Sequence, residues 1–336
     1  MIEKNTSKIK TKIGLFFGGL GNEAEVSVLS AKNVAENFDY EKYELALIYW
    51  HKDRFFYRVK NFSEIKKPTR RIKEENFAAT FDIALPETHG RFGEDGILQS
   101  IFERHGIKYC GCRVLSSALC MDKAVCKNYL SGYDIRQTKF EVIDFDCFNK
   151  KEISLKLQEI ENTFKLPLFI KPANSGSSVG ITKVSNIKSI KNAINTAQKH
   201  DHKIVIEEGL EGVREIEVGI LGNGKIIVSR PGELIPGKEF YDYEDKYENG
   251  KTKIIIPAKL TANQEENIVL MAKKIYRLFN CSGFARLDFF IAKNKIYFNE
   301  INTLPGFTKS SMYPMLMMNS KMTYKELINK IIELAR

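Results

Sequence analysis

The fold is decided by residues 285–306, which read ARLDFFIAKNKIYFNEINTLPG. Their pattern predicts two apolar strands, residues 286–291 and 295–302, joined by a tight turn at Lys293 and Asn294. Such a hairpin buries its apolar side chains in a sheet, so the polar residues within it require a separate explanation.

Four polar side chains fall on one face of this hairpin. Glu300 and Asn302 project from the same side of the second strand, and Arg286 and Asp288 share a face of the first. Carboxylates are rarely buried without a partner, and hard oxygen ligands grouped in this way suit Mg²⁺, which takes further ligands from nucleotide phosphates. An amphipathic surface hairpin with solvated charges is the alternative. The loop that follows favours a metal-phosphate site, because Gly306 lets backbone N–H groups approach a ligand.

Length and composition predict a globular protein of two or three domains. The chain has 336 residues, and 43% of them are hydrophobic. The first apolar run, residues 13–17, is too short for a signal peptide, and no stretch approaches the roughly 20 apolar residues of a membrane span. We therefore expect a soluble cytoplasmic protein with no membrane partner. The six cysteines show neither a disulfide framework nor zinc spacing, so we expect reduced, structural thiols.

The charge pattern argues against a nucleic-acid partner. The formal net charge is +10, but lysines are spread along the chain and acidic residues are interleaved with them. Nucleic-acid binders more often concentrate their charge on one helix or arm. The excess is interpreted as a general lysine bias, which at most attracts anionic substrates such as ATP.

The first 117 residues alternate strands and helices, which is typical of a parallel α/β layer. Residues 19–24 fit G-x-G-x-x-A, but the acid that a dinucleotide fold needs about 20 residues further on is missing from the end of the second strand. An NAD-dependent oxidoreductase is therefore a remote alternative. Glu23 in this turn either caps the following helix or receives a substrate ammonium at the rim of a site.

Three further segments have compositions typical of functional loops. Residues 88–96 hold three glycines together with His, Arg, Glu and Asp. The strand that ends in Lys171 runs into a Gly/Ser-rich loop, residues 172–180, which is a means of holding phosphates but is not a Walker loop. Glu207 and Glu208 close another apolar strand, where they are either solvated or bind an adenine or ribose. Residues 231–257 are polar and aromatic without a regular pattern, so we predict a lid.

Taken together, these segments resemble the D-alanine–D-alanine ligases of the ATP-grasp superfamily over nearly the whole chain. The matching motifs are GGLGNEAEVSVLSA, HGRFGEDG, SALCMDK, IKPANSGSSVG, IEEGL with REIEV, FYDYEDKY, ARLDFF and NEINTLPGFTKSSMYP. The resemblance implies an α/β, ATP-grasp fold. A Rossmann-like α/β domain at residues 1–117 precedes two α+β subdomains that clasp ATP, at residues 118–210 and 211–336, the second with the lid 231–257.

The resemblance also implies which residues bind ATP. Lys123 and Lys171 contact the phosphates, and Lys246 reaches them from the lid. Glu207 holds the adenine with the help of neighbouring backbone, and Glu215 holds the ribose. The full set expected to bind ATP is Lys123, Lys171, Ser177, Glu207, Glu208, Leu210, Glu215, Lys246 and Asn299.

By the same resemblance, Asp288, Glu300 and Asn302 bind two Mg²⁺ ions, with Glu300 bridging them and Mn²⁺ as a substitute. The expected catalytic residues are Glu23, Ser177, Tyr247, Arg286, Gly306 and Ser311. The residues expected to contact the substrates are Glu23, His89, Arg286, Gly306, Ser311 and Met312.

The implied reaction joins two molecules of D-alanine for peptidoglycan synthesis. The carboxylate of the first attacks the γ-phosphate to give an acyl phosphate, and the amine of the second then displaces phosphate. Glu23 receives the first ammonium in a network with Ser177 and Tyr247. Arg286 and the Gly306 N–H stabilise the oxyanion.

The resemblance leaves some alternatives open. D-lactate or D-serine as the second substrate is the main one, and a homodimer is plausible from related enzymes. Ala24 and Glu87 depart from the family pattern, but we expect them to leave these contacts in place.

Overall fold

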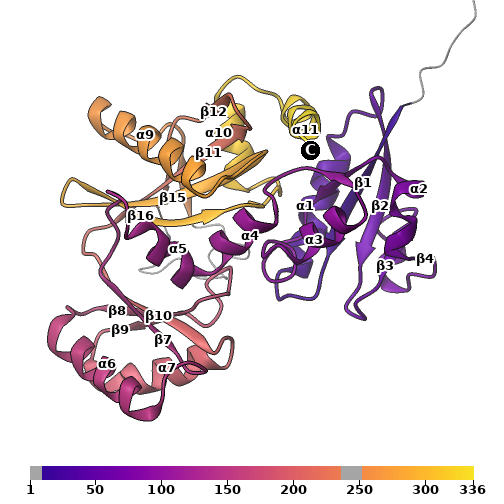
Figure 1. Cartoon of the computed structure of the whole chain (residues 1–336). Coiled ribbons are helices and arrows are strands. Elements are labelled where there is room, and N and C mark those ends of the chain that lie inside the picture. The colour runs from indigo at the N-terminus through magenta and orange to yellow at the C-terminus, as the bar shows by residue number, and fades with distance from the viewer. Residues whose placement is uncertain (1–9, 236–251) are drawn as a thin grey trace, which may run out of the picture.

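The computed structural model describes residues 10–235 and 252–336, which form three sheets with their helices (Figure 1). Residues 236–251 of the predicted lid, including Lys246 and Tyr247, lie outside the described residues. Within the described ranges, no helix has the length and the apolar run needed to cross a bilayer.

The N-terminal sheet is the predicted α/β layer, with strand order β4-β3-β2-β1-β5-β6. β1 pairs in parallel with β2 and β5, and β5 with β6. β3 and β4 extend the sheet with antiparallel pairing, which their short, charged sequences did not predict. The elements are β1 Thr11–Gly18, α1 Ala24–Glu36, β2 Tyr43–Trp50, β3 Phe56–Val59, β4 Arg71–Ile72, α2 Phe77–Thr80, β5 Ile83–Pro86, α3 Ile97–Arg104 and β6 Lys108–Tyr109.

Two helices lead from this sheet to a four-stranded antiparallel sheet of order β7-β10-β8-β9. An apolar cluster between this sheet and helices α6 and α7 forms the core of the central part. The elements are α4 Val114–Met121, α5 Lys123–Leu130, β7 Phe140–Asp144, α6 Lys150–Thr163, β8 Leu168–Pro172, β9 Thr182–Val184, α7 Ile190–Gln198 and β10 Lys203–Glu208.

The third sheet has the order β14-β13-β11-β15-β16, with β12 paired to β11. β13 and β14 pair with each other at the two ends of the predicted lid, so the expectation that residues 231–257 lack regular structure is wrong at those ends. The elements are β11 Arg214–Gly222, β12 Ile226–Val228, β13 Gly232–Ile235, β14 Lys253–Ile255, α9 Ala262–Leu278, β15 Phe284–Ala292, β16 Lys295–Asn302, α10 Met312–Asn319 and α11 Tyr324–Glu333.

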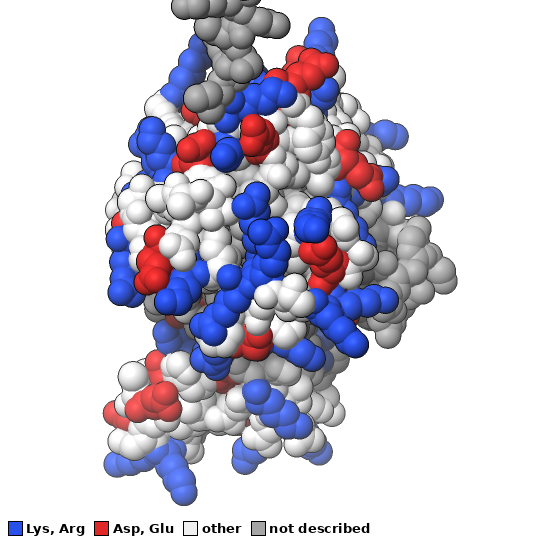
Figure 2. All heavy atoms as spheres, turned by 90° about the vertical axis from the view of Figure 1, so that its right-hand side faces the viewer, with Lys and Arg blue, Asp and Glu red and all other residues white. Residues whose placement is uncertain are grey.

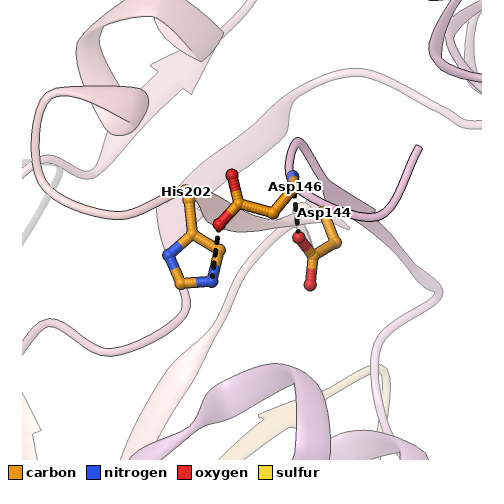
Figure 3. Close-up of side chains that lie close together, drawn as sticks. All are labelled: Asp144, Asp146 and His202. Carbon is orange, nitrogen blue, oxygen red and sulfur yellow. Dashed lines mark hydrogen bonds and ion pairs between the residues drawn. The ribbon is translucent and has the colours of Figure 1, made fainter. Parts of the chain in front are cut away.

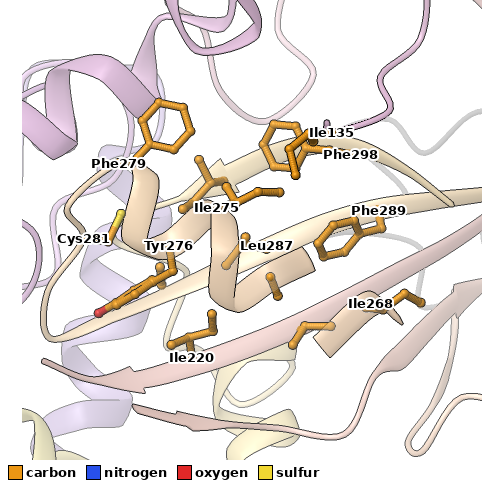
Figure 4. Close-up of a cluster of buried hydrophobic side chains, with 14 of the residues drawn as sticks. Ile135, Ile220, Ile268, Ile275, Tyr276, Phe279, Cys281, Leu287, Phe289 and Phe298 are labelled. Carbon is orange, nitrogen blue, oxygen red and sulfur yellow. The ribbon is translucent and has the colours of Figure 1, made fainter. Parts of the chain in front are cut away.

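The predicted hairpin is confirmed as β15 and β16, and a bulge sets which way its residues face. Asp288 pairs with Glu300, whereas the next residue, Phe289, pairs with Phe298, so Asn299 is an extra residue in β16. Phe298 therefore packs with Phe289 in the core (Figure 4), while Glu300 projects from the opposite face of the sheet. Without the bulge, residues 298 and 300 would share a face.

The C-terminal helix returns to the N-terminal sheet. Leu327 and Ile331 of α11 are buried in one cluster with Ile13 and Leu15 of β1, and the C-terminus lies beside that sheet in Figure 1. The domain boundaries at residues 117 and 210 stay a prediction. The last helix, placed by that division in the C-terminal subdomain, packs against the N-terminal domain.

The reactivity of the thiols tests how completely the cysteines are buried in the fold. Five of the six cysteines are buried and Cys147 alone is exposed. Burial raises the pKa of Cys120 to about 11 and that of Cys126 to about 12, which leaves little reactive thiolate near neutral pH. We expect one equivalent of rapid reaction with a disulfide reagent at pH 8, rising to six on denaturation. Cys147→Ser should abolish the rapid phase. Two or more fast-reacting thiols in the native protein would contradict the burial of the other five cysteines.

Candidate active site

A cavity of about 360 Å³ lies where the three sheets meet, and all three parts contribute to its lining. Every residue that the sequence assigned to a site and that the structure describes lines this cavity. They are Glu23, His89, Lys123, Lys171, Ser177, Glu207, Glu208, Leu210, Glu215, Arg286, Asp288, Asn299, Glu300, Asn302, Gly306, Ser311 and Met312.

The carboxylate face of the β15–β16 hairpin forms one wall. Asp288 lies opposite Glu300, and the Asn302 amide donates to Asp288 Oδ2 at 3.0 Å. Arg286 donates to both Asp288 oxygens, at 2.8 and 2.7 Å, and its Nε lies 2.8 Å from Glu217 Oε2. The three predicted metal-binding residues therefore lie side by side on one wall of the cavity, as the spacing of the hairpin indicated.

Arg286 balances the negative charge of this wall. Burial disfavours its charged form, but the Asp288 and Glu217 carboxylates more than offset that cost and raise the pKa of Arg286 further above its ordinary value. Glu217 was not predicted as a site residue. Its alternation with Ile216 and Val218 on β11 places it on the polar face, but the partner strand cannot be identified from sequence spacing.

The Gly/Ser-rich loop faces this wall through Lys123. The Lys123 ammonium donates to the Ser175 carbonyl at 2.7 Å and lies 3.6 Å from Glu300 Oε2. Ser177 and Ser178 have positive φ angles of 49° and 61°, an uncommon backbone conformation for residues that carry a side chain. Lys123 connects this loop to the carboxylate wall.

Lys171 belongs to a buried charge cluster behind the loop. Its ammonium lies 3.0 Å from Glu207 Oε2, and the Lys127 ammonium lies 3.3 Å from Oε1. Burial alone would raise the pKa of Glu207, but the two lysines more than offset this effect and lower that pKa to about 2. The solvated alternative for Glu207 is wrong, because its side chain is 3% exposed. Lys127 was not predicted as a site residue, because its position on a helix carries no signal of its partner.

Glu23 links the N-terminal domain to the loop. It begins α1 without a side-chain capping bond, and its carboxylate instead accepts the hydroxyl of Ser177. A Cβ atom at Gly90 or at Gly176 would lie 2.0 or 2.6 Å from Glu23 Oε2, so a side chain at either position would displace the carboxylate from this place. The helix-capping interpretation of Glu23 is therefore wrong, and the carboxylate lies at the rim of the cavity.

His89 fixes the loop that follows the hairpin. Its Nδ1 lies 3.1 Å from the Leu304 carbonyl, which only accepts, so Nδ1 carries the proton and Nε2 accepts from the Ser30 hydroxyl at 2.8 Å. Ser30 in turn accepts from the Phe307 N–H at 3.2 Å. Burial lowers the pKa of His89 more than the nearby Glu23 raises it, so the imidazole is neutral at neutral pH.

Two carboxyl groups near the cavity, the partly buried Glu94 and the buried Glu87, were not predicted as site residues. Glu94 accepts from the Gly90 N–H at 3.0 Å, and burial together with the charge of Glu23 raises the pKa of Glu94 to about 8. Burial also raises the pKa of Glu87 well above its usual range. Of the two, Glu94 lines the cavity and Glu87 does not.

The other end of the cavity combines polar and apolar groups. Ser311 Oγ accepts from the Thr308 N–H at 2.9 Å and lies so close to Gly306 that a Cβ there would be 2.8 Å from it. Met312 and Leu234 pack together beside this turn. The arrangement suits a small amino acid with a carboxylate and a short apolar side chain.

A second group of metal-ligand type lies outside this cavity. Asp144, Asp146 and His202 place their ligand atoms within 4.8 Å of one another on the central subdomain (Figure 3). Two of the three are exposed, and the His202 imidazole already lies 3.2 Å from Asp201 and 3.8 Å from Asp146. The group does not contribute to the cavity lining.

Comparison with known proteins gives one consistent family. A family model described as "D-ala D-ala ligase N-terminus" matches residues 12–112, and one described as "D-ala D-ala ligase C-terminus" matches residues 130–333. The D-alanine--D-alanine ligase of Caldicellulosiruptor bescii is 43% identical, with 97% of this chain and 95% of the relative covered. The D-alanine--D-alanine ligase of Clostridium acetobutylicum is 40% identical, with 97% of this chain and 98% of the relative covered.

Solved structures agree with the sequence relatives. The VanG D-Ala:D-Ser ligase from Enterococcus faecalis superposes with a TM-score of 0.85 at 34% identity, covering 97% of this chain and 99% of that one. The D-alanine-D-alanine ligase from Coxiella burnetii superposes with a TM-score of 0.82 at 28% identity, covering 97% of this chain and 93% of that one.

The buried cluster around Glu207 predicts a pH-dependent loss of stability. Glu207→Gln leaves two lysine charges without their carboxylate, and a pKa of about 2 against an ordinary 4.5 corresponds to about 3 kcal/mol at pH 7. The stabilising form is the carboxylate, so its contribution is complete above pH 4.5 and is lost as the pH falls toward 2. In urea titrations, the difference in free energy of unfolding between wild type and Glu207→Gln should be about 1 kcal/mol smaller at pH 3.5 than at pH 7.

Glu208→Gln is the matched control, because its carboxylate is partly exposed and, within the described part of the chain, accepts only a backbone N–H, that of Lys165. We expect it to change the free energy of unfolding by less than about 0.5 kcal/mol. Equal effects of the two substitutions would show that the buried cluster does not stabilise the fold.

Proposed function

The chain belongs to the D-alanine–D-alanine ligase family, and we propose that it uses ATP to join two D-alanine molecules into D-alanyl-D-alanine for peptidoglycan precursors. The family consists of ATP-dependent carbon–nitrogen ligases with the ATP-grasp fold. The observation that carries the proposal is the convergence of a phosphate-type loop, a carboxylate wall and an ammonium-binding carboxylate, Glu23, on one cavity.

The phosphates of ATP fit between the loop and the wall. Lys123 bridges Ser175 and Glu300, so it is placed to hold a phosphate next to the carboxylates, and Lys171 approaches from the strand behind. We assign the adenine to Glu207 with the backbone of residues 208–210, and the ribose to Glu215. We also assign Lys246 and Asn299 to the binding of ATP.

Asp288, Glu300 and Asn302 suit Mg²⁺ because they offer carboxylate and amide oxygens from adjacent strands. We assign two ions to them, with Glu300 shared and Mn²⁺ as a substitute. Bound there, the metal neutralises charge on the phosphates. The chain itself holds Asp288 in place through Arg286 and Asn302, so the site is oriented before any ligand enters.

The first D-alanine is assigned to Glu23, whose carboxylate receives the ammonium while Ser177 and Tyr247 complete the network. His89, neutral and hydrogen-bonded on both ring nitrogens, shapes the neighbouring wall without adding charge. The second D-alanine is assigned to the turn at Ser311, with its methyl group against Met312.

The reaction then follows in two steps. The first carboxylate attacks the γ-phosphorus and releases ADP, which leaves an acyl phosphate. The amine of the second D-alanine attacks that carbonyl, loses a proton and expels inorganic phosphate. Arg286 and the Gly306 N–H line the same cavity and are assigned to the oxyanion that forms between these events. Water would hydrolyse the acyl phosphate, and its exclusion is the purpose we assign to the predicted lid.

One alternative has specific support. The VanG D-Ala:D-Ser ligase from Enterococcus faecalis is 34% identical to this chain, so D-serine is the competing second substrate. Homodimerisation and a cytoplasmic location stay predictions.

Glu300→Gln tests the carboxylate wall. The substitution keeps the size of the side chain but removes one metal-binding charge, so we expect D-alanine-dependent ADP release to fall by about 100-fold or more. The melting temperature should stay close to that of wild type. Glu211→Gln, an exposed acid outside the cavity, is the control and should keep normal turnover. Near-normal turnover of Glu300→Gln would remove Glu300 from the metal site.

A substrate panel separates the alternatives. D-Alanine, D-serine and D-lactate are offered as second substrates, and ADP release and product mass are recorded. Because Met312, Leu234 and Ile254 line the cavity, we expect D-alanine to be preferred over D-serine by about ten- to a hundredfold in kcat/KM. A higher kcat/KM with D-serine than with D-alanine would show that D-serine is the second substrate. Absence of both ADP and dipeptide with D-alanine would overturn the proposed function.

A further inference from the structure

Half of the net positive charge of the chain comes from one short segment of the N-terminal domain. Residues 51–76 hold nine Lys or Arg residues and four Asp or Glu residues, a net charge of +5 out of +10 for the chain. The segment contains β3 and β4, which form one edge of the N-terminal sheet, and the turns around them. All nine cationic side chains are exposed: Lys52, Arg54, Arg58, Lys60, Lys66, Lys67, Arg70, Arg71 and Lys73.

These cations, which we call the β3–β4 basic patch, are not neutralised by the protein. Within residues 10–235 and 252–336, Lys73 is the one member of the patch that pairs with a carboxylate, that of Glu75 at 3.3 Å. The remaining acids of the segment have other partners. Asp53 binds Tyr57 and His51, Glu64 accepts from the Lys60 backbone N–H, and Glu74 lies 3.6 Å from His105.

The patch is an extended surface and not a pocket. Figure 2 looks onto this side of the molecule, where Lys and Arg side chains run across the middle with fewer acids between them. None of the nine residues lines the active-site cavity or the smaller groove beside α9. A small anion needs a concave site with converging donors, whereas a surface of many anionic groups needs only exposed, unpaired cations.

One aromatic contact favours a lipid surface over a nucleic acid. Phe55 is 40% exposed at the turn before β3, and the Arg71 guanidinium lies 3.1 Å from its ring centroid. One face of the ring is therefore occupied, which disfavours stacking on a base. The exposed remainder, in a segment rich in Lys and Arg, matches the aromatic and basic composition of proteins that bind at a membrane interface.

We propose that the β3–β4 basic patch binds this protein peripherally to an anionic phospholipid surface. The contact is electrostatic and reversible, it involves no membrane-spanning helix, and it leaves the active-site cavity open to its substrates. It reverses the expectation of no membrane partner, which rested on the lack of a membrane span and of a signal peptide. Half of the charge excess, expected to be spread along the chain, lies instead at one edge of the N-terminal sheet, where β3, β4 and the turns around them place nine cations.

The test is sedimentation of the full-length protein with phospholipid vesicles. Vesicles of phosphatidylcholine with 30% phosphatidylglycerol are compared with pure phosphatidylcholine, at 50, 150 and 300 mM NaCl. We expect binding to the anionic vesicles only, weakening as salt increases. Each cation near such a surface contributes about fivefold to partitioning, so neutralising five should lower it by about a thousandfold or more.

The patch variant carries five substitutions to glutamine, and its control removes the same charge from exposed lysines of the central subdomain. The patch variant is Arg58→Gln, Lys60→Gln, Lys66→Gln, Lys67→Gln and Arg70→Gln. The control is Lys150→Gln, Lys151→Gln, Lys188→Gln, Lys191→Gln and Lys199→Gln. Both should keep wild-type ligase turnover in solution, since neither set lines the cavity.

Loss of vesicle binding in the patch variant alone supports the proposal. Equal loss in both variants would assign the effect to net charge, and unchanged binding of the patch variant would place the contact elsewhere; either result overturns it. Binding of wild type to single-stranded RNA at 150 mM NaCl without binding to anionic vesicles also overturns it, in favour of a nucleic-acid partner. If the patch variant does not fold, the comparison of vesicle compositions with wild type decides.

Discussion

The structure depends on how charge is balanced on one face of the C-terminal sheet. Strand alternation and the bulge at Asn299 place Glu217, Asp288 and Glu300 together there, where carboxylates repel one another unless cations lie between them. Arg286 separates Glu217 from Asp288, and Lys123 reaches Glu300 from the start of α5. Because Lys123 also binds the phosphate-type loop, the same ion pair that steadies the wall fixes the distance between the wall and the loop.

The two charge clusters at the cavity have different physical roles. Lys127 and Glu207 are almost fully buried, at 2% and 3% exposure, so no solvent or ligand can readily replace either partner. Such a pair is a permanent part of the scaffold. Arg286 keeps 17% of its side chain exposed, and its partners line the cavity. A charged ligand that enters can compete for these groups, so this second cluster is suited to rearrange during a reaction.

Much of the site could be predicted from sequence because its residues lie within short, regular segments. Two-residue spacing on strands was enough to group Asp288, Glu300 and Asn302. Contacts made across the chain could not be predicted in this way. The bulge at Asn299 depends on pairing with β15, the burial of Lys127 depends on Glu207 of a distant strand, and the packing of α11 on the N-terminal sheet depends on the whole chain path. Periodicity records which face of an element is apolar, but not which element covers it.

The loop that carries Gly306 shows why domain arrangement is part of the site. Both backbone groups of the next residue, Phe307, are held from outside the hairpin: its N–H by Ser30 of α1, and its carbonyl by Asn33 and by Tyr324 of α11. The Leu304 carbonyl is bound to His89 of the N-terminal domain. A loop held at these points cannot move independently of that domain. The direction of the Gly306 N–H is therefore set by how the N-terminal domain packs on the C-terminal sheet, so a substitution in that interface would alter the cavity without touching a residue that lines it.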